Sequence, residues 1–170
     1  MTAIELLCYL AAQLHIVIQK RLNHSILSDN FMRLSKRGEY GLRALQDLAR
    51  HHGEGMLTNS ELAERNNIPA RFLEQIMLTL KHGHIVRSRK GPRGGYTLAR
   101  SPEQINLAEV VRLLDGPLSP VSCTSETAYE PCGCPDMNTC GLRRVMKEVR
   151  DVVAQMMENT TLADLTIDHT

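Results

Sequence analysis

The chain has 170 residues, of which 42% are hydrophobic, and a formal net charge of +1. This length suits one modest domain with additions, and the near-zero charge argues against a protein that coats nucleic acid broadly while still allowing one basic face. Aromatic residues are sparse, with no Trp, two Phe and four Tyr, so aliphatic side chains must fill the core, which favours a helical protein.

Residues 1–31 predict an N-terminal extension. Residues 4–18 are fairly apolar, but Glu5, Gln13 and His15 interrupt them. The segment lacks a basic start and an obvious small-residue cleavage site, which disfavours a signal peptide, and it is short and polar for a membrane span. It is either the product of a mis-assigned upstream start or an extra helix that packs on the domain. We therefore expect a cytoplasmic protein without a membrane partner.

The first helix of the domain is expected over residues 35–51, because Ser35 can cap it and apolar residues recur along one side. Lys36 lies near its start, where it is either a contact to DNA phosphates or an ordinary surface charge. Glu39, in the same turn, is an exposed helix carboxylate in the simplest interpretation.

Residues 57–100 predict a helix, a turn, a second helix and a two-stranded hairpin. Thr58 and Glu61 form a capping box that starts the first of these helices, and Pro69 suits the first turn of the second. One face of the second helix carries the apolar residues Phe72, Leu73, Ile76, Met77 and Leu80. Gly83 is expected to end it.

The hairpin has a Gly- and Pro-rich tip at residues 91–95. Residues 85–102 contain no Asp or Glu, and their positive charges are Arg87, Arg89, Lys90, Arg93 and Arg100. A short helix with exposed polar side chains can read base edges in a major groove, and a basic hairpin can hold phosphates or probe a minor groove. The order of elements predicts a winged helix-turn-helix domain that binds DNA. The alternative is a winged helix used for protein contacts.

A connecting helix follows, starting at Asn106 and Glu109 in a second capping pattern. After it comes a long loop, a feature that is usually functional in a compact domain. Four of the five cysteines lie in or just after this loop: Cys123, Cys132, Cys134 and Cys140. Such soft thiolates select zinc, copper(I) or iron–sulfur clusters. The C-x-C spacing of Cys132 and Cys134 is poor for structural zinc, whereas clusters tolerate irregular spacing.

The last helix is expected to start at a cap on Asn138 or Thr139. Its apolar seam has heptad spacing and consists of Leu142, Val145, Val149, Val152 and Met156. This seam predicts a helix that crosses to its twin in a homodimer, although it could instead fold back on its own domain. The tail is polar and expected to fray.

The predicted organisation has six segments: an N-terminal extension (1–31), a winged helix-turn-helix DNA-binding domain (32–101), a connecting helix (102–117), a Cys-rich sensor loop (118–138), a dimerisation helix (139–159) and a tail (160–170). The expected fold class is mainly α with a small β-hairpin wing. No paired carboxylates, P-loop or Cys–His–Asp arrangement at plausible spacing is present, so we do not expect an enzyme.

Residues 32–45, 72–75 and 91–96, together with the Cys-rich loop before a long helix, resemble the Rrf-type family of bacterial regulators. This family includes the iron–sulfur cluster regulator, the nitric-oxide-sensitive repressor and the cysteine-metabolism repressor. The resemblance covers residues 32 to about 159. It implies a homodimeric winged helix-turn-helix transcription factor, a repressor on a palindromic operator in double-stranded DNA.

The resemblance also implies which residues contact DNA. The groove-reading candidates are Arg71, Glu74 and Gln75, and the wing contacts are Lys90 and Arg93. Arg89 and Lys36 are further candidates because of their charge and position. Arg93 stands where the family often has Gly, which is a departure from its pattern.

The implied cofactor is an iron–sulfur cluster, either 2Fe–2S or 4Fe–4S, that senses redox state, nitric oxide or iron. Its ligands by resemblance are Cys123, Cys134 and Cys140. Arg143 stands where the iron–sulfur cluster regulator has a ligating His, so a fourth ligand must come from Cys132, from Glu39 of the partner subunit or from a small molecule. The alternative is a cluster-free regulator of the same fold that senses through cysteine thiols or a partner protein.

Overall fold

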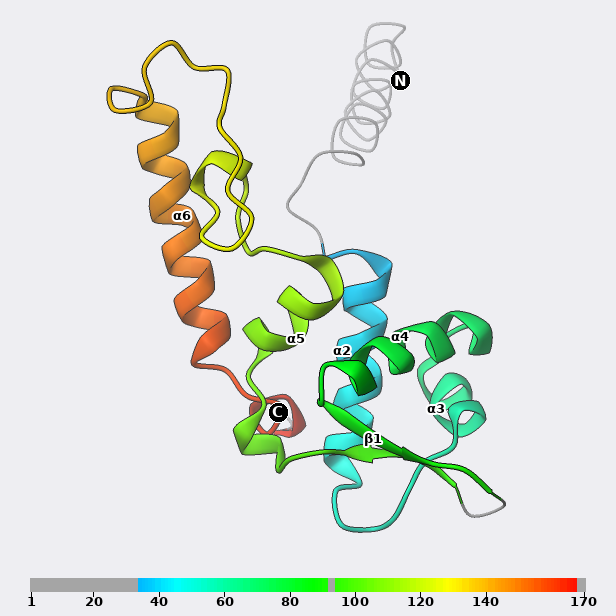
Figure 1. The fold of residues 1–170 in the computed structure, drawn as a ribbon. Coiled ribbons are helices and arrows are strands. Elements are labelled where there is room, and N and C mark those ends of the chain that lie inside the picture. The colour runs from blue at the N-terminus through cyan, green and yellow to red at the C-terminus, as the bar shows by residue number, and fades with distance from the viewer. Residues whose placement is uncertain (1–33, 92–93, 168–170) are drawn as a thin grey trace, which may run out of the picture. The chain divides into compact units, whose positions relative to one another are not determined.

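The computed structural model describes residues 34–91 and 94–167 (Figure 1), which belong to one compact unit beginning at Leu34. The expectations for residues 1–31 and for Arg93 lie outside the described residues. None of the helices in the described ranges is long and apolar enough to cross a membrane.

The elements occur in the order expected for a winged helix, which confirms the predicted fold class. The helices and strands are α2 (Lys36–Arg50), α3 (Asn59–Asn66), α4 (Ala70–His82), β1 (Val86–Arg89), β2 (Gly95–Leu98), α5 (Leu107–Asp115) and α6 (Gly141–Glu158). The short 3-10 helices are η1 (Pro102–Gln104), η2 (Ser122–Thr124) and η3 (Asp164–Thr166). Side-chain caps confirm three predicted starts, at Ser35, Thr58 and Asn106.

The core lies where α2, α3, α4 and α5 meet behind the hairpin. The fully buried side chains of α2, α3 and α4 include Leu45, Leu62, Leu73, Ile76, Met77 and Leu80. The predicted apolar face of α4 is therefore confirmed with one correction, because Phe72 is 38% exposed. Its ring instead meets the edge of Tyr40, with centroids 5.9 Å apart. Phe72 lies at the border of the apolar stripe of α4. There the exposed fraction of a side chain depends on how closely the neighbouring helix packs.

Gly83 ends α4 for a different reason from the one expected. Its φ is −79°, and the left-handed residue is His84, with φ of 57°. A Cβ on Gly83 would lie 2.2 Å from Cδ2 of Leu113 on α5. The glycine therefore allows α5 to pack closely against the end of α4.

The wing is a single antiparallel hairpin in which Val86 pairs with Leu98 and Arg89 with Gly95. The segment before α3 joins its edge, because Tyr96 N donates to Leu57 O at 2.8 Å and Leu57 N donates to Tyr96 O at 3.1 Å. The wing and the helix-turn-helix are thus connected by main-chain hydrogen bonds as well as by the core.

The expectation of a frayed tail was wrong for residues 160–167. Leu162 is fully buried, and its N–H donates to Ile105 O at 2.9 Å, while Leu107 N donates to Thr160 O at 2.9 Å. Gln46 of α2 holds the end of the segment by donating from Nε2 to Leu165 O at 2.6 Å. A short segment with two leucines gives no periodic signal, so only its distant partners reveal that it belongs to the core.

Replacing Leu162 by Ala should therefore destabilise the protein by about 2–5 kcal/mol, the range for deleting a buried leucine side chain. The matched control is Ile167→Ala, because Ile167 is 60% exposed and its loss should cost within about 0.5 kcal/mol. Urea unfolding followed by circular dichroism measures both. Equal midpoints for the two variants would mean that the tail does not contribute to the core.

Candidate functional site

The exposed face of α4 carries the three residues predicted to read base edges. Arg71, Glu74 and Gln75 are all exposed, whereas Leu73 and Ile76 beside them are buried in the core. The core thus fixes the orientation of this face. Arg37, at the start of α2, reaches the same helix by donating from Nη2 to Thr79 Oγ1 at 2.6 Å.

The basic patch on the wing is smaller than its charge count suggested. Arg87, Arg89 and Lys90 are exposed on or next to β1. Arg100 instead lies against α5, where its Nη2 is 2.6 Å from Glu109 Oε1 and its Nη1 donates to Gln104 O. The Glu109 carboxylate offsets the charge of Arg100, so Arg100 does not extend the basic surface of the hairpin.

Lys36 and Glu39 contact each other within one chain. Lys36 Nζ lies 2.6 Å from Glu39 Oε2, and Arg43 Nη1 lies 3.8 Å from Glu39 Oε1. Lys36 remains exposed at the start of α2, so it stays a candidate for a phosphate contact. The role of Glu39 as a ligand across a dimer stays a prediction.

The four cysteines of the loop and of the start of α6 line one cavity of about 310 Å³, namely Cys123, Cys132, Cys134 and Cys140. Its other lining residues are Val121, Ser122, Leu142 and Arg143. Cys123 is buried, and Cys132, Cys134 and Cys140 are half-buried, all as free thiols. The fold therefore brings together the residues that the sequence predicted to act together.

The Sγ atoms of Cys134 and Cys140 are 3.8 Å apart. Two thiolates bound about 2.3 Å from one tetrahedral metal ion would lie about 3.8 Å apart, so this pair has suitable spacing for one metal. In residues 34–91 and 94–167, no three His, Cys, Asp or Glu side chains are already arranged to hold a metal ion. The donors are thus gathered, and completing a site requires side-chain rotation.

Hydrogen bonds among the thiols shift the pKa values of Cys132 and Cys134 in opposite directions. Those from Cys134 lower the pKa of Cys132. The pKa of Cys134 is raised to about 12 by its hydrogen bonds with Cys132 and Cys140. Burial raises the pKa of Cys123. Hydrogen bonds from its neighbours therefore favour the thiolate form of Cys132 over those of Cys123 and Cys134.

The cap of α6 differs from the expected one. Cys140 is the N-cap, and its Sγ accepts a hydrogen bond from Arg143 N at 3.4 Å. Asn138 and Thr139 instead bond to Asp136, through Asn138 N and Thr139 Oγ1, both at 2.9 Å. The expected cap on Asn138 or Thr139 was wrong because this local turn satisfies both residues first.

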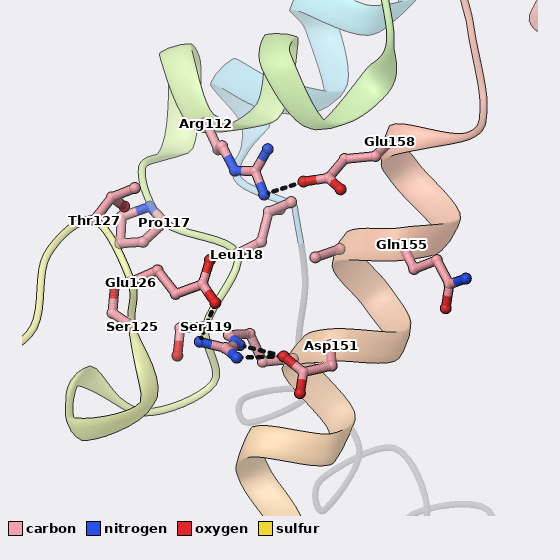
Figure 2. A pocket seen from close by; sticks show the side chains of 12 residues that line it. Arg112, Pro117, Leu118, Ser119, Ser125, Glu126, Thr127, Asp151, Gln155 and Glu158 are labelled. Carbon is pink, nitrogen blue, oxygen red and sulfur yellow. Dashed lines mark hydrogen bonds and ion pairs between the residues drawn. The ribbon is translucent and has the colours of Figure 1, made fainter.

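Arg150 is the residue that the sequence pattern did not indicate. Its side chain is only 10% exposed, and Nη1 donates to Thr124 O at 2.7 Å. It also pairs with Glu126, at 3.1 Å, and with Asp151. Both carboxylates line a cavity of about 200 Å³, in which Figure 2 labels them. Arg143, one heptad earlier, donates from Nε to Cys123 O at 3.3 Å. Arg143 and Arg150 are seven residues apart, and this spacing places both on one face of α6. That spacing was the one feature of the sequence that could have indicated their shared role.

The predicted apolar seam of α6 faces outward in the single chain. Leu142 is 62% exposed, Val152 63% and Met156 69%. The arginine-bearing side of α6, not the seam, contacts η2, since Arg150 is the buried residue of this helix. The alternative in which the seam folds back on its own domain is therefore not what the structure shows.

Comparisons with known proteins agree with this geometry. Residues 34–168 match the Rrf2 family, described as an iron-dependent transcriptional regulator. The chain is 38% identical over 136 residues to an rrf2-like HTH-type transcriptional regulator of Rhodobacter capsulatus, covering 78% of this chain and 91% of that one. It resembles the structure of CymR, the global cysteine regulator of B. subtilis, with 32% identity over 80% of this chain and 97% of that chain and a TM-score of 0.68. It also resembles T. potens IscR, with 29% identity, coverage of 79% and 85%, and a TM-score of 0.63.

Replacing Arg150 by Met should destabilise the protein by about 1–3 kcal/mol, because the carbonyl of Thr124 loses its buried donor. The ion pairs add little, since the carboxylates of Glu126 and Asp151 are 74% and 53% exposed and solvent screens them. Arg144→Met is the control, because Arg144 lies on the same helix with its side chain 73% exposed and pairs only with Glu148 at 3.2 Å among the ion pairs of the described residues. Urea unfolding should leave the control within about 0.5 kcal/mol of the native chain; an equal loss in both variants would contradict an anchoring role.

Proposed function

Since the chain belongs to the Rrf2 family of transcriptional regulators, we propose that it is a cytoplasmic homodimeric repressor. Its DNA binding would respond to redox state, nitric oxide or iron through an iron–sulfur cluster. The observation that carries the cluster is the meeting of four cysteines in one cavity. The family's description as iron-dependent supports it.

DNA binding is assigned to α4 and the wing. Arg71, Glu74 and Gln75 would read base edges from the major groove, and Arg89 and Lys90 would contact phosphates beside it. The main-chain hydrogen bonds between Leu57 and Tyr96 hold the wing beside the helix-turn-helix. Both parts can therefore contact one operator half-site at once.

A homodimer is supported by the exposed seam of α6. Leu142, Val152 and Met156 are each more than 60% exposed, and a second copy would remove this apolar surface from water. A two-fold dimer carries two copies of α4 and suits a palindromic operator with half-sites about one helical turn apart.

The donor chemistry of the cysteine cavity fits an iron–sulfur cluster, because soft thiolates are the ligands that clusters require. Cys123, Cys134 and Cys140 would hold it, with Cys132 as an extra or alternative ligand. When bound, the cluster would supply a centre whose integrity depends on oxidants, nitric oxide and iron. Arg143 holds the main chain of Cys123 in place through its carbonyl.

The structure suggests how the site would be coupled to DNA binding. Cys140 caps one end of α6, and the segment after its other end pairs with residues around α5, through Thr160 and Leu162. A change in the side-chain arrangement at Cys140 can therefore bias the position of α6 relative to the winged domain. A preference of a few kcal/mol between two arrangements is enough to change operator occupancy.

A second candidate function is regulation through the thiols themselves. The Sγ atoms of Cys134 and Cys140 are already within 3.8 Å as free thiols, and the chain is similar to CymR, named as a cysteine regulator. Such a regulator would have the same fold and DNA-binding residues but no cluster, and would sense through its cysteines or a partner protein.

Protein purified without oxygen should be coloured and contain equal amounts of iron and acid-labile sulfide, both lost in Cys134→Ala. The reason is that Cys134 interacts with two of the other thiols, those of Cys132 and Cys140. Visible absorption and chemical counting per subunit measure this. A colourless protein, even after anaerobic reconstitution with iron and sulfide, would instead favour the thiol regulator.

Lys90→Ala should weaken operator binding and lower the slope of log K against log salt by about one, because one phosphate contact is lost. Lys147→Ala is the matched control, since Lys147 is exposed on α6 outside the seam. Fluorescence anisotropy with operator DNA at several salt concentrations gives both slopes. An unchanged slope for Lys90→Ala removes Lys90 from the contacts.

A further inference from the structure

We propose that Cys132 is the fourth ligand, so that each chain holds its metal group entirely through its own thiolates, those of Cys123, Cys132, Cys134 and Cys140. This inference rests on the proposed metal-dependent function and specifies its donor set. It differs from a site with three cysteines and a ligand from elsewhere, which the sequence left open.

The first support is the position of Cys132 among the thiols. Its thiol makes hydrogen bonds with both Cys123 and Cys134, and Cys134 in turn lies 3.8 Å from Cys140. The four sulfur atoms thus form a continuous series in which Cys132 stands between Cys123 and the other two. A group shared by Cys123, Cys134 and Cys140 would have to occupy space next to the sulfur of Cys132.

The second support is the composition of the cavity wall. Apart from the four cysteines, the described lining residues are Val121, Ser122, Leu142 and Arg143. This set contains no carboxylate and no imidazole. Arg143 has no acceptor atom and cannot bind a metal. Cys132 is therefore the only additional soft donor that the cavity of one chain offers.

The competing carboxylate is already engaged elsewhere. Glu39 lies on α2, where its two oxygens contact Lys36 and Arg43 at 2.6 and 3.8 Å. Reaching a cluster in another subunit would require giving up these contacts. Cys132 needs only local adjustment, and next to it a Cβ built on Gly133 would meet nothing within 4 Å.

The charge around the cavity also suits four thiolates. Arg143 lines the cavity, and its Nε is fixed 3.3 Å from Cys123 O. A cation held at the wall offsets the extra negative charge that a fourth thiolate brings. A site that took a neutral imidazole in place of Cys132 would need this compensation less.

The test compares Cys132→Ser with two controls in the full-length chain reconstituted without oxygen. Cys8→Ser changes the one cysteine outside the sensor region, and Glu39→Gln removes the competing carboxylate. We expect Cys132→Ser to lose at least half of its iron and sulfide or to shift its visible and electron paramagnetic resonance spectra, with both controls unchanged. Cys132→Ala and far-UV circular dichroism show whether any loss comes from misfolding. Native-like spectra and iron content in Cys132→Ser, or a spectral change in Glu39→Gln alone, would overturn the proposal.

A titration with Co²⁺ tests the donor set even if no cluster forms, so the failure of the cluster can be told apart from the failure of the four-thiolate site. Thiolate-to-cobalt charge-transfer absorption scales with the number of bound thiolates, so Cys132→Ser should reduce it by about one quarter, from four ligands to three. The Cys8→Ser control should match the native chain. Equal absorption in Cys132→Ser and the native chain, or no cobalt absorption in the native chain, would refute the all-thiolate site.

Discussion

A buried positive charge determines how the cysteine loop packs against α6. Arg150 lies on α6 with its side chain only 10% exposed, and the carbonyl of Thr124 is its innermost partner. A buried guanidinium must be hydrogen-bonded to be tolerated, so the loop cannot leave this side of α6 without leaving the charge or the carbonyl unsatisfied. Because Cys123 directly precedes Thr124 in η2, the same hydrogen bond keeps the first cysteine of the site beside α6.

The two ends of α6 serve different parts of the molecule. At the first end, Cys140 is both the helix cap and a wall of the cysteine cavity. Beyond the second end, Leu162 fills the core of the winged domain. The helix is therefore a rigid connection about 27 Å long, given a rise of about 1.5 Å per residue, between the thiols and the domain that carries α4.

Local patterns were enough to predict the winged helix, because capping residues such as Thr58 and Asn106 and the periodicity of α4 act within a few residues. The residue types and clustering of the cysteines predicted that they form one site. They did not predict which thiols contact one another. The role of Arg150, the half-exposed ring of Phe72 and the burial of Leu162 depend on partners between 26 and 57 positions away, at Thr124, Tyr40 and Ile105. Short segments without a period carry no signal for such long-range contacts.

The place of Leu162 in the core has a consequence for the order of synthesis. Chains emerge from the ribosome with the N-terminus first, and domains generally fold as units when their residues are available. Here the core that supports α4 is not complete until residues 160–165 have emerged, after the whole cysteine loop and α6. A nascent chain therefore cannot complete its winged helix-turn-helix fold before the cysteine loop has been synthesised, and a chain truncated within that loop would lack a complete winged domain as well.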